Sequence, residues 1–150
     1  MRIETAIKKF KSYLPKLRTQ YEWLEGRPHM LDCASGYSYI TGGKDVISCS
    51  QHKAHMVNNK TWIQNTPTQT KRPVRGKAII FDWQAQYSDT AHIGLVLSYD
   101  KKTDEVEYIS ANSAPDGRVR IKSVGFRVVT GWGWVNLKPE KKITIKKEAK

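Results

Sequence analysis

The feature that most constrains the fold is a change of periodicity part-way along the chain. Up to about residue 58 the apolar residues recur at helical spacing, and from Lys77 onward short apolar runs are separated by turn residues. A polar connection with two prolines, residues 65–73, lies between the two parts. Helices first and an antiparallel sheet afterwards is the order of an α+β fold. With 150 residues, the chain is expected to be one domain with a substantial core.

The first part of the chain predicts three helices. One has apolar residues at i, i+3 and i+4 with lysines on its other face, and it should end or bend near Pro15. A second should start at Cys33, with Asp32 as its N-cap, and stop at the Gly42–Gly43 pair. A third should follow Ser48, which can cap it, and run to about residue 58. The apolar face of the first helix consists of Ile3, Ala6, Ile7, Phe10, Leu14 and Leu17.

The second part predicts a run of strands. Turn residues at 100–104 and 115–117 separate them. The expected strands are 78–81, 93–97, 106–109, 118–121 and 126–135. The last stretch, 138–150, is rich in lysine and is expected to be a basic tail or linker, which leaves residues 1–137 as the domain.

The charge of the chain favours a polyanionic partner. Its formal net charge is +12, which should attract nucleic acid, anionic lipid or wall teichoic acids, and charge alone does not choose among them. The same charge is also compatible with a surface trait that only aids solubility. No apolar run is long enough to span a membrane, and Lys8, Lys9 and Lys11 interrupt any signal-peptide pattern.

A cysteine and a histidine stand where a hydrolase would need them. Cys33 lies at an expected helix start, where the partial positive charge favours a thiolate. His92 begins an apolar strand, and an imidazole there could accept the thiol proton and return it to a leaving amine. The other cysteine is Cys49. A disulfide between the two would rule out this chemistry, and the sequence leaves that alternative open.

A hairpin register adds a third residue to this pair. If the hairpin is centred on Lys102, His92 lies opposite Asn112, whose carboxamide could orient the imidazole ring. Gly94 then shares the face of His92, and its missing side chain would leave room for the helix that starts at Cys33.

These segments resemble those of a CHAP domain, the cysteine- and histidine-dependent amidohydrolase/peptidase family related to NlpC-type cell-wall peptidases. The aspartate–cysteine helix start at 31–36 resembles the family's Asp-Cys-Ser-Gly, and His92–Val96 its His-Val-Gly-Ile-Val strand. Asn112 falls where members carry the asparagine of Glu-Gly-Asn. Two positions depart from the pattern: Lys77 replaces the aspartate of Gly-Asp, and Ser110 replaces a glutamate.

The resemblance implies a papain-like fold, with N-terminal helices packed on a C-terminal antiparallel sheet. It also implies a peptidoglycan hydrolase, either an N-acetylmuramoyl-L-alanine amidase or an endopeptidase, with Cys33, His92 and Asn112 as catalytic residues. No cofactor or metal is required. The expected protein is a monomeric catalytic domain of a phage lysin that acts on the bacterial wall. A holin would release it from the host cytoplasm, or it would be part of a larger phage protein.

Aromatic residues offer candidate substrate contacts. Tyr21, Trp23 and Trp62 could line a groove and stack on a glycan or stem peptide, although packing in the core explains them equally well.

Two other functions stay open. One is a non-catalytic module that binds wall polymer or nucleic acid through charge and aromatic residues. The other is a metal-dependent hydrolase built on Cys49, His52 and His55, which have the spacing Cys-x2-His-x2-His, with His29 as a possible fourth ligand. Cys49 could also be the nucleophile if the alignment with the family is shifted.

Overall fold

The computed structural model describes residues 1–16, 33–42, 48–81, 92–113 and 117–137, without the side chains of residues 112 and 113. Within these ranges the chain forms three α-helices and a six-stranded antiparallel sheet, so the fold is α+β as predicted. The helices are α1 (Ile3–Lys11), α3 (Cys33–Ile40) and α4 (Cys49–Asn58). None of the helices in these ranges is both long and apolar enough to cross a membrane.

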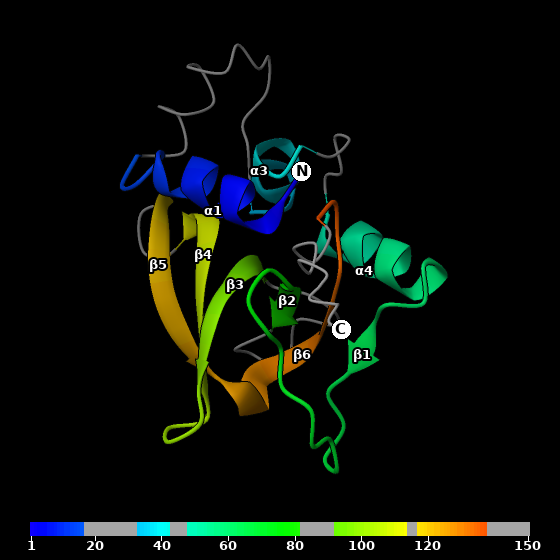
Figure 1. The fold of residues 1–150 in the computed structure, drawn as a ribbon. Coiled ribbons are helices and arrows are strands. Elements are labelled where there is room, and N and C mark those ends of the chain that lie inside the picture. The colour runs from blue at the N-terminus through cyan, green and yellow to red at the C-terminus, as the bar shows by residue number, and fades with distance from the viewer. Residues whose placement is uncertain (17–32, 43–47, 82–91, 114–116, 138–150) are drawn as a thin grey trace, which may run out of the picture.

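The sheet has the strand order β1-β6-β2-β3-β4-β5, and every neighbouring pair is antiparallel (Figure 1). A short 3-10 turn, Phe126–Val128, connects the last two strands in the chain. The strands are β1 (Ile63–Gln64), β2 (Ala78–Phe81), β3 (His92–Asp100), β4 (Glu105–Ser113), β5 (Arg118–Gly125) and β6 (Val129–Gly133). All five predicted strands are therefore present, and β1 was not predicted.

The helix boundaries follow from capping. Within the described residues α3 spans Cys33–Ile40, and the chain then turns at Gly42, whose φ of +81° is open to glycine. Helix α4 begins after Ser48, whose Oγ accepts a hydrogen bond from the backbone N–H of Gln51 at 3.2 Å. The proposed cap of α3, Asp32, lies outside the described residues.

The two faces of the sheet carry separate cores. On one face Ile93, Leu95 and Leu97 of β3 join a cluster with buried residues of α1 and α3. On the other face Val96 of β3 and Tyr108 of β4 belong to a second cluster without helix residues. This alternation is the period of two expected for strands buried on both faces.

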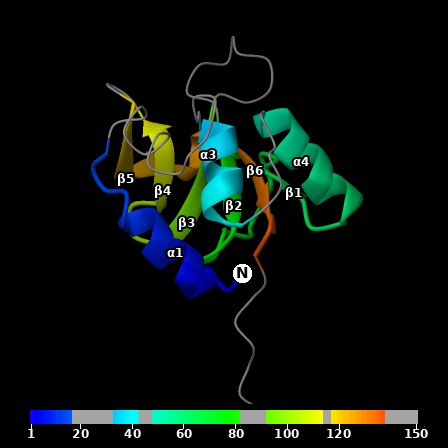
Figure 2. The same cartoon turned by 90° about the horizontal axis from the view of Figure 1, so that it is seen from above.

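Helix α3 lies across the middle of the sheet. It contacts β3 and β4, while α1 contacts β4 and α3 (Figure 2). Helix α4 also contacts α3. Helix α3, which begins with Cys33, therefore packs on the two strands that contain His92 and Asn112.

Candidate active site

Cys33 is the first residue of α3 and is partly exposed. Its thiol is reduced, and its Sγ lies 3.8 Å from the Sγ of Cys49, the first residue of α4. A cysteine in the first turn of a helix lies close to backbone N–H groups that no helix carbonyl accepts, and these favour the thiolate. The position of Cys33 therefore suits a nucleophile.

His92 is the first residue of β3 and is 6% exposed. Its Nε2 lies 2.8 Å from Oγ of Ser110 on β4, in a buried hydrogen bond. The rings of Phe81 and Tyr108 pack edge-on to the imidazole, with centroids 5.4 Å and 6.4 Å away. The hydrogen bond to Ser110 and the two aromatic contacts all help to hold the ring in place.

The hairpin register agrees with the prediction in only part of its length. Leu95 pairs with Ile109 and Val96 with Tyr108, as a turn centred on Lys102 requires. Nearer the turn, Ser98 pairs with Glu107, because an irregularity after Val96 shifts the register by one residue. The predicted register is therefore wrong near the turn and confirmed at Leu95 and Val96, while the pairing of His92 with Asn112 stays a prediction.

Asn112 lies within β4, but its side chain is outside the part that the structure describes. The role of Asn112 in orienting His92 thus stays a prediction. Ser110 makes a contact that the prediction did not include. The sequence held a signal for Ser110, because residues 110 and 112 of a regular strand would share a face.

Gly94 does not leave room for a helix. A Cβ built on Gly94 would lie 2.6 Å from Cδ2 of Tyr108, so the ring of this tyrosine fills the space. The prediction that the start of α3 approaches there is wrong, because α3 packs on the other face of β3, among Ile93 and Leu95. The side chain of His92 belongs to the face of Tyr108.

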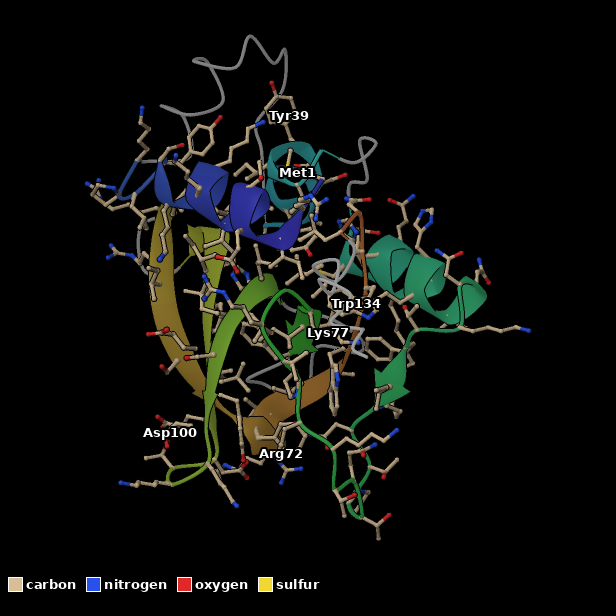
Figure 3. All side chains as sticks on the ribbon, viewed as in Figure 1. Met1, Tyr39, Arg72, Lys77, Asp100 and Trp134 are labelled. Carbon is tan, nitrogen blue, oxygen red and sulfur yellow. The ribbon has the colours of Figure 1, made fainter. Side chains whose placement is uncertain are left out.

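Cys33 and His92 nevertheless belong to segments at the same end of the molecule. Asp100, the last residue of β3, lies at the end of the sheet far from α1 and α3, so the His92 end of β3 points toward these helices (Figure 3). Ala34, next to Cys33, and Ile93, next to His92, belong to one buried cluster. The direct approach of the thiol to the imidazole stays a prediction.

Lys77, the departure from the family's Gly-Asp, has a contact of its own. Its Nζ lies 4.1 Å from the ring centroid of Trp134 (Figure 3). Burial lowers the pKa of this ammonium group. The lysine therefore packs against an aromatic ring on the β6 side of the sheet.

The alternative metal site is not assembled in the described part of the chain. His52 is fully buried and its Nε2 donates to the carbonyl of Ala34 at 3.0 Å, whereas His55 is exposed. Within the described ranges no group of three histidine, cysteine or acidic side chains could hold a metal ion. His29 lies outside these ranges. Cys49 and His52 share a face of α4, and His55 does not join them.

Of the predicted substrate contacts, Tyr21 and Trp23 lie outside the described residues. Trp62 is partly buried and packs over Gly131, where a Cβ would lie 2.2 Å from its ring. Its Nε1 donates to Oε1 of Gln64 at 3.1 Å. These contacts favour the packing explanation that the sequence left open.

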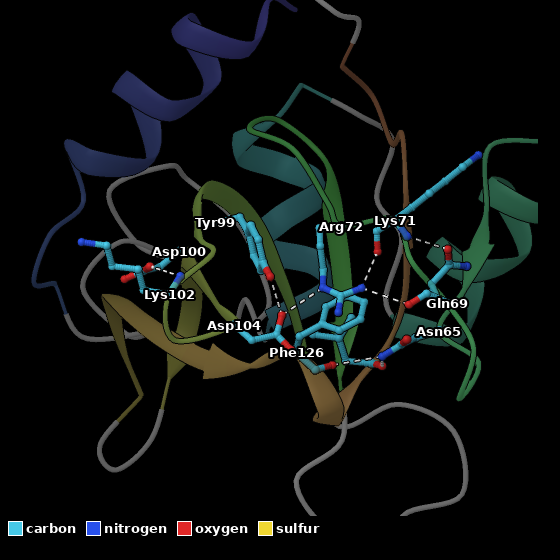
Figure 4. Close-up of polar contacts among 10 residues, drawn as sticks. Asn65, Gln69, Lys71, Arg72, Tyr99, Asp100, Lys102, Asp104 and Phe126 are labelled. Atoms are coloured by element: carbon cyan, nitrogen blue, oxygen red, sulfur yellow. Dashed lines mark hydrogen bonds and ion pairs between the residues drawn. The ribbon is translucent and has the colours of Figure 1, made fainter.

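A polar cluster occupies the opposite end of the sheet. Arg72 donates through Nε to Asp104 at 2.9 Å, stacks on Phe126 at 3.8 Å, and lines a cleft of about 330 Å³ with Asn65 (Figure 4). The hydrogen bond from Tyr99, followed by that from Arg72, holds the pKa of Asp104 below its usual value. The cluster fixes the turn after β3 to the end of β5.

No protein-family model matches the chain, and no similar protein was found among curated proteins or among solved structures. The class that the fold defines is α+β, with a helix starting at a cysteine and packed on strands that carry a buried histidine.

Proposed function

We propose that this chain is a cysteine hydrolase of the papain-like CHAP type that cleaves an amide bond in bacterial peptidoglycan. The observation that carries the proposal is Cys33 at the first position of α3, a helix packed on β3 and β4, with His92 at the start of β3. The hydrogen bond between His92 and Ser110 supports a fixed orientation of the imidazole ring. The domain proposed for this activity is 1–137, with 138–150 as a basic tail or linker.

In the proposed mechanism, Cys33 is the nucleophile and His92 is the general base. The imidazole of His92 acts as the base that accepts the proton of Cys33. The thiolate attacks the amide carbonyl carbon, and the backbone N–H of Cys33 stabilises the oxyanion. The C–N bond then breaks as His92 returns the proton to the leaving amine. Water, deprotonated by His92, attacks the thioester and releases the carboxylate and the thiol.

The charge distribution supports an anionic polymer as the partner. The net charge of +12 favours attachment to a wall that carries teichoic acids. Basic residues alternate along β5, the edge strand, and Arg120 is paired with Ser110, the partner of His92. A basic strand next to the histidine would draw the acidic groups of a wall fragment toward it.

The test is clearance of purified Gram-positive walls, followed as loss of turbidity under reducing conditions. Wild type should clear the walls, whereas Cys33→Ala and His92→Ala should not. Cys49→Ala is the matched control, because it removes the neighbouring thiol and keeps the nucleophile. Equal clearance by wild type and Cys33→Ala would refute the proposal, and so would no clearance by wild type.

The same experiment separates the other functions. A protein that binds walls without clearing them would be a non-catalytic module. Activity lost with a chelator but kept after iodoacetamide would indicate the metal-dependent alternative. Mass spectrometry of the digested wall distinguishes an amidase, which frees the N-terminal alanine of the stem, from an endopeptidase. In this proposal the enzyme works as a monomer without a cofactor, as the catalytic part of a phage lysin that a holin releases or a larger phage protein carries.

A further inference from the structure

The two cysteines of the chain lie against each other. The Sγ atoms of Cys33 and Cys49 are 3.8 Å apart, and both thiols are reduced. A disulfide has an S–S length of about 2.05 Å, so the two sulfurs need to approach by roughly 1.8 Å. Side-chain rotation and a small shift between α3 and α4 can supply that movement.

Both thiols have surroundings that favour reaction. Each cysteine is the first residue of its helix, where backbone N–H groups stabilise a thiolate. Cys33 is partly exposed and can meet a reagent from solvent, whereas Cys49 is 6% exposed and behind it. This division suits an attacking thiol at position 33 and a resolving thiol at position 49.

A second contact holds the two helix starts together. His52, one turn after Cys49 in α4, donates from Nε2 to the carbonyl of Ala34, the residue after Cys33, at 3.0 Å. Both the histidine and the alanine are buried. The spacing of the two sulfurs is therefore set by the packing of α3 against α4.

We propose that Cys33 and Cys49 form a reversible disulfide in response to a low-molecular-weight disulfide, and that this closure removes the nucleophile from the hydrolase. From the sequence, a disulfide between the two cysteines and a free catalytic thiol were alternatives. With the two sulfurs 3.8 Å apart, one chain can alternate between a reduced, active form and a disulfide form. The loss of hydrolysis rests on the proposed function. The formation of the disulfide does not.

The exchange is balanced with oxidised glutathione as the reagent. The Cys33 thiolate attacks one glutathione sulfur, the glutathione S–S bond breaks, and one glutathione thiolate leaves. The Cys49 thiolate then attacks the sulfur of Cys33 and releases the second glutathione thiolate. The protein loses two electrons and two protons, and oxidised glutathione takes them up to give two molecules of reduced glutathione.

The first measurement is mass spectrometry of the full chain after equilibration in oxidised and reduced glutathione. Oxidised protein should lose the mass of two hydrogens, and a tryptic digest without reductant should join the peptides 19–44 and 45–53. Cys49→Ala should keep its mass apart from a glutathione adduct on Cys33. Thiols that stay reduced in fully oxidising buffer, wild type that keeps the adduct, or a disulfide between two chains would each overturn the proposal.

The second measurement is wall clearance by the same samples. Oxidised wild type should fall to the level of Cys33→Ala and recover fully with dithiothreitol. Clearance that is unchanged although the 33–49 disulfide has formed would overturn the switch. If reduced wild type clears no walls, the proposed function fails, and the mass measurement still decides whether the thiol pair is redox-active.

Discussion

Gly94 offers a sharp test of how the sheet positions His92. In Gly94→Ala the new methyl carbon would lie 2.6 Å from Cδ2 and 3.1 Å from Cγ of Tyr108, closer than side-chain carbons approach each other. The ring of Tyr108 cannot easily retreat, because it is 1% exposed and packs on Phe81 with centroids 4.8 Å apart. Overpacking of this kind lowers the free energy of unfolding by about 1–3 kcal/mol. Replacing a glycine within a strand raises it by about 0.5–1 kcal/mol, because the unfolded chain loses conformational freedom. We expect a net loss of about 1–2 kcal/mol.

The assay is urea unfolding, with the midpoint lowered and the slope unchanged. Gly125→Ala is the matched control, because its Cβ would find its nearest neighbour, Cγ of Arg127, at 4.0 Å with φ at −63°, and its stability should stay within about 0.5 kcal/mol of wild type. In a Tyr108→Leu background, whose methyl groups can rotate away, the cost of Gly94→Ala should fall by at least half. If that cost is the same in both backgrounds, Tyr108 is not what occupies the space, and the packing argument around His92 fails.

Three further substitutions test other parts of the structure. Ser110→Ala removes the hydrogen bond to Nε2 of His92, which costs about 1–3 kcal/mol, so kcat for wall clearance should fall by about 5- to 160-fold with KM unchanged. Ser110→Thr should restore most of the lost kcat, and a change in KM alone would refute a positioning role for Ser110. The hydroxyl of Tyr37 is buried and has no hydrogen-bond partner in the described part of the chain. Tyr37→Phe should therefore unfold with a free energy equal to that of wild type or higher by up to about 1 kcal/mol in a thermal melt. Clear destabilisation would show that the hydroxyl is hydrogen-bonded. The pKa of the Asp104 carboxyl is lowered by the hydrogen bond from Tyr99 and then by that from Arg72. The stability that this carboxylate contributes is therefore complete above its ordinary pKa of 3.8 and is lost as the pH falls through the lower pKa of the folded state. Asp104→Asn should lower the free energy of unfolding at neutral pH and flatten its dependence on acid pH, measured from unfolding curves.

The fold could be predicted because local signals agreed with one another. Ser48 predicted the start of α4, and alternation predicted the strands. The strand β1, Ile63–Gln64, was not predicted, because two residues are too few to show an alternating pattern. Its pairing with Trp132 depends on tertiary contacts that no local pattern encodes.

The hairpin shows why a site can be predicted better than the turn beside it. The register irregularity after Val96 absorbs one residue between the turn and the middle of the hairpin. The pairs nearest the turn are thus displaced, while Leu95 and Ile109 keep the predicted register. The alternation also placed Gly94 correctly on the same face of β3 as His92. It does not predict which element packs on that face, and the side chain that fills the space beside Gly94 is Tyr108, not α3.

The contact between Cys33 and Cys49 lay beyond any local argument, since the two residues are 16 positions apart on separate helices. Its consequence follows from a single physical cause. The helix N-terminus that favours the thiolate needed for amide attack also favours the thiolate needed for disulfide exchange. The property that makes a thiolate at position 33 reactive therefore also makes it prone to oxidation. A second thiol 3.8 Å away can trap Cys33 as a disulfide before it is oxidised to the sulfinic acid, and reduction reverses this disulfide.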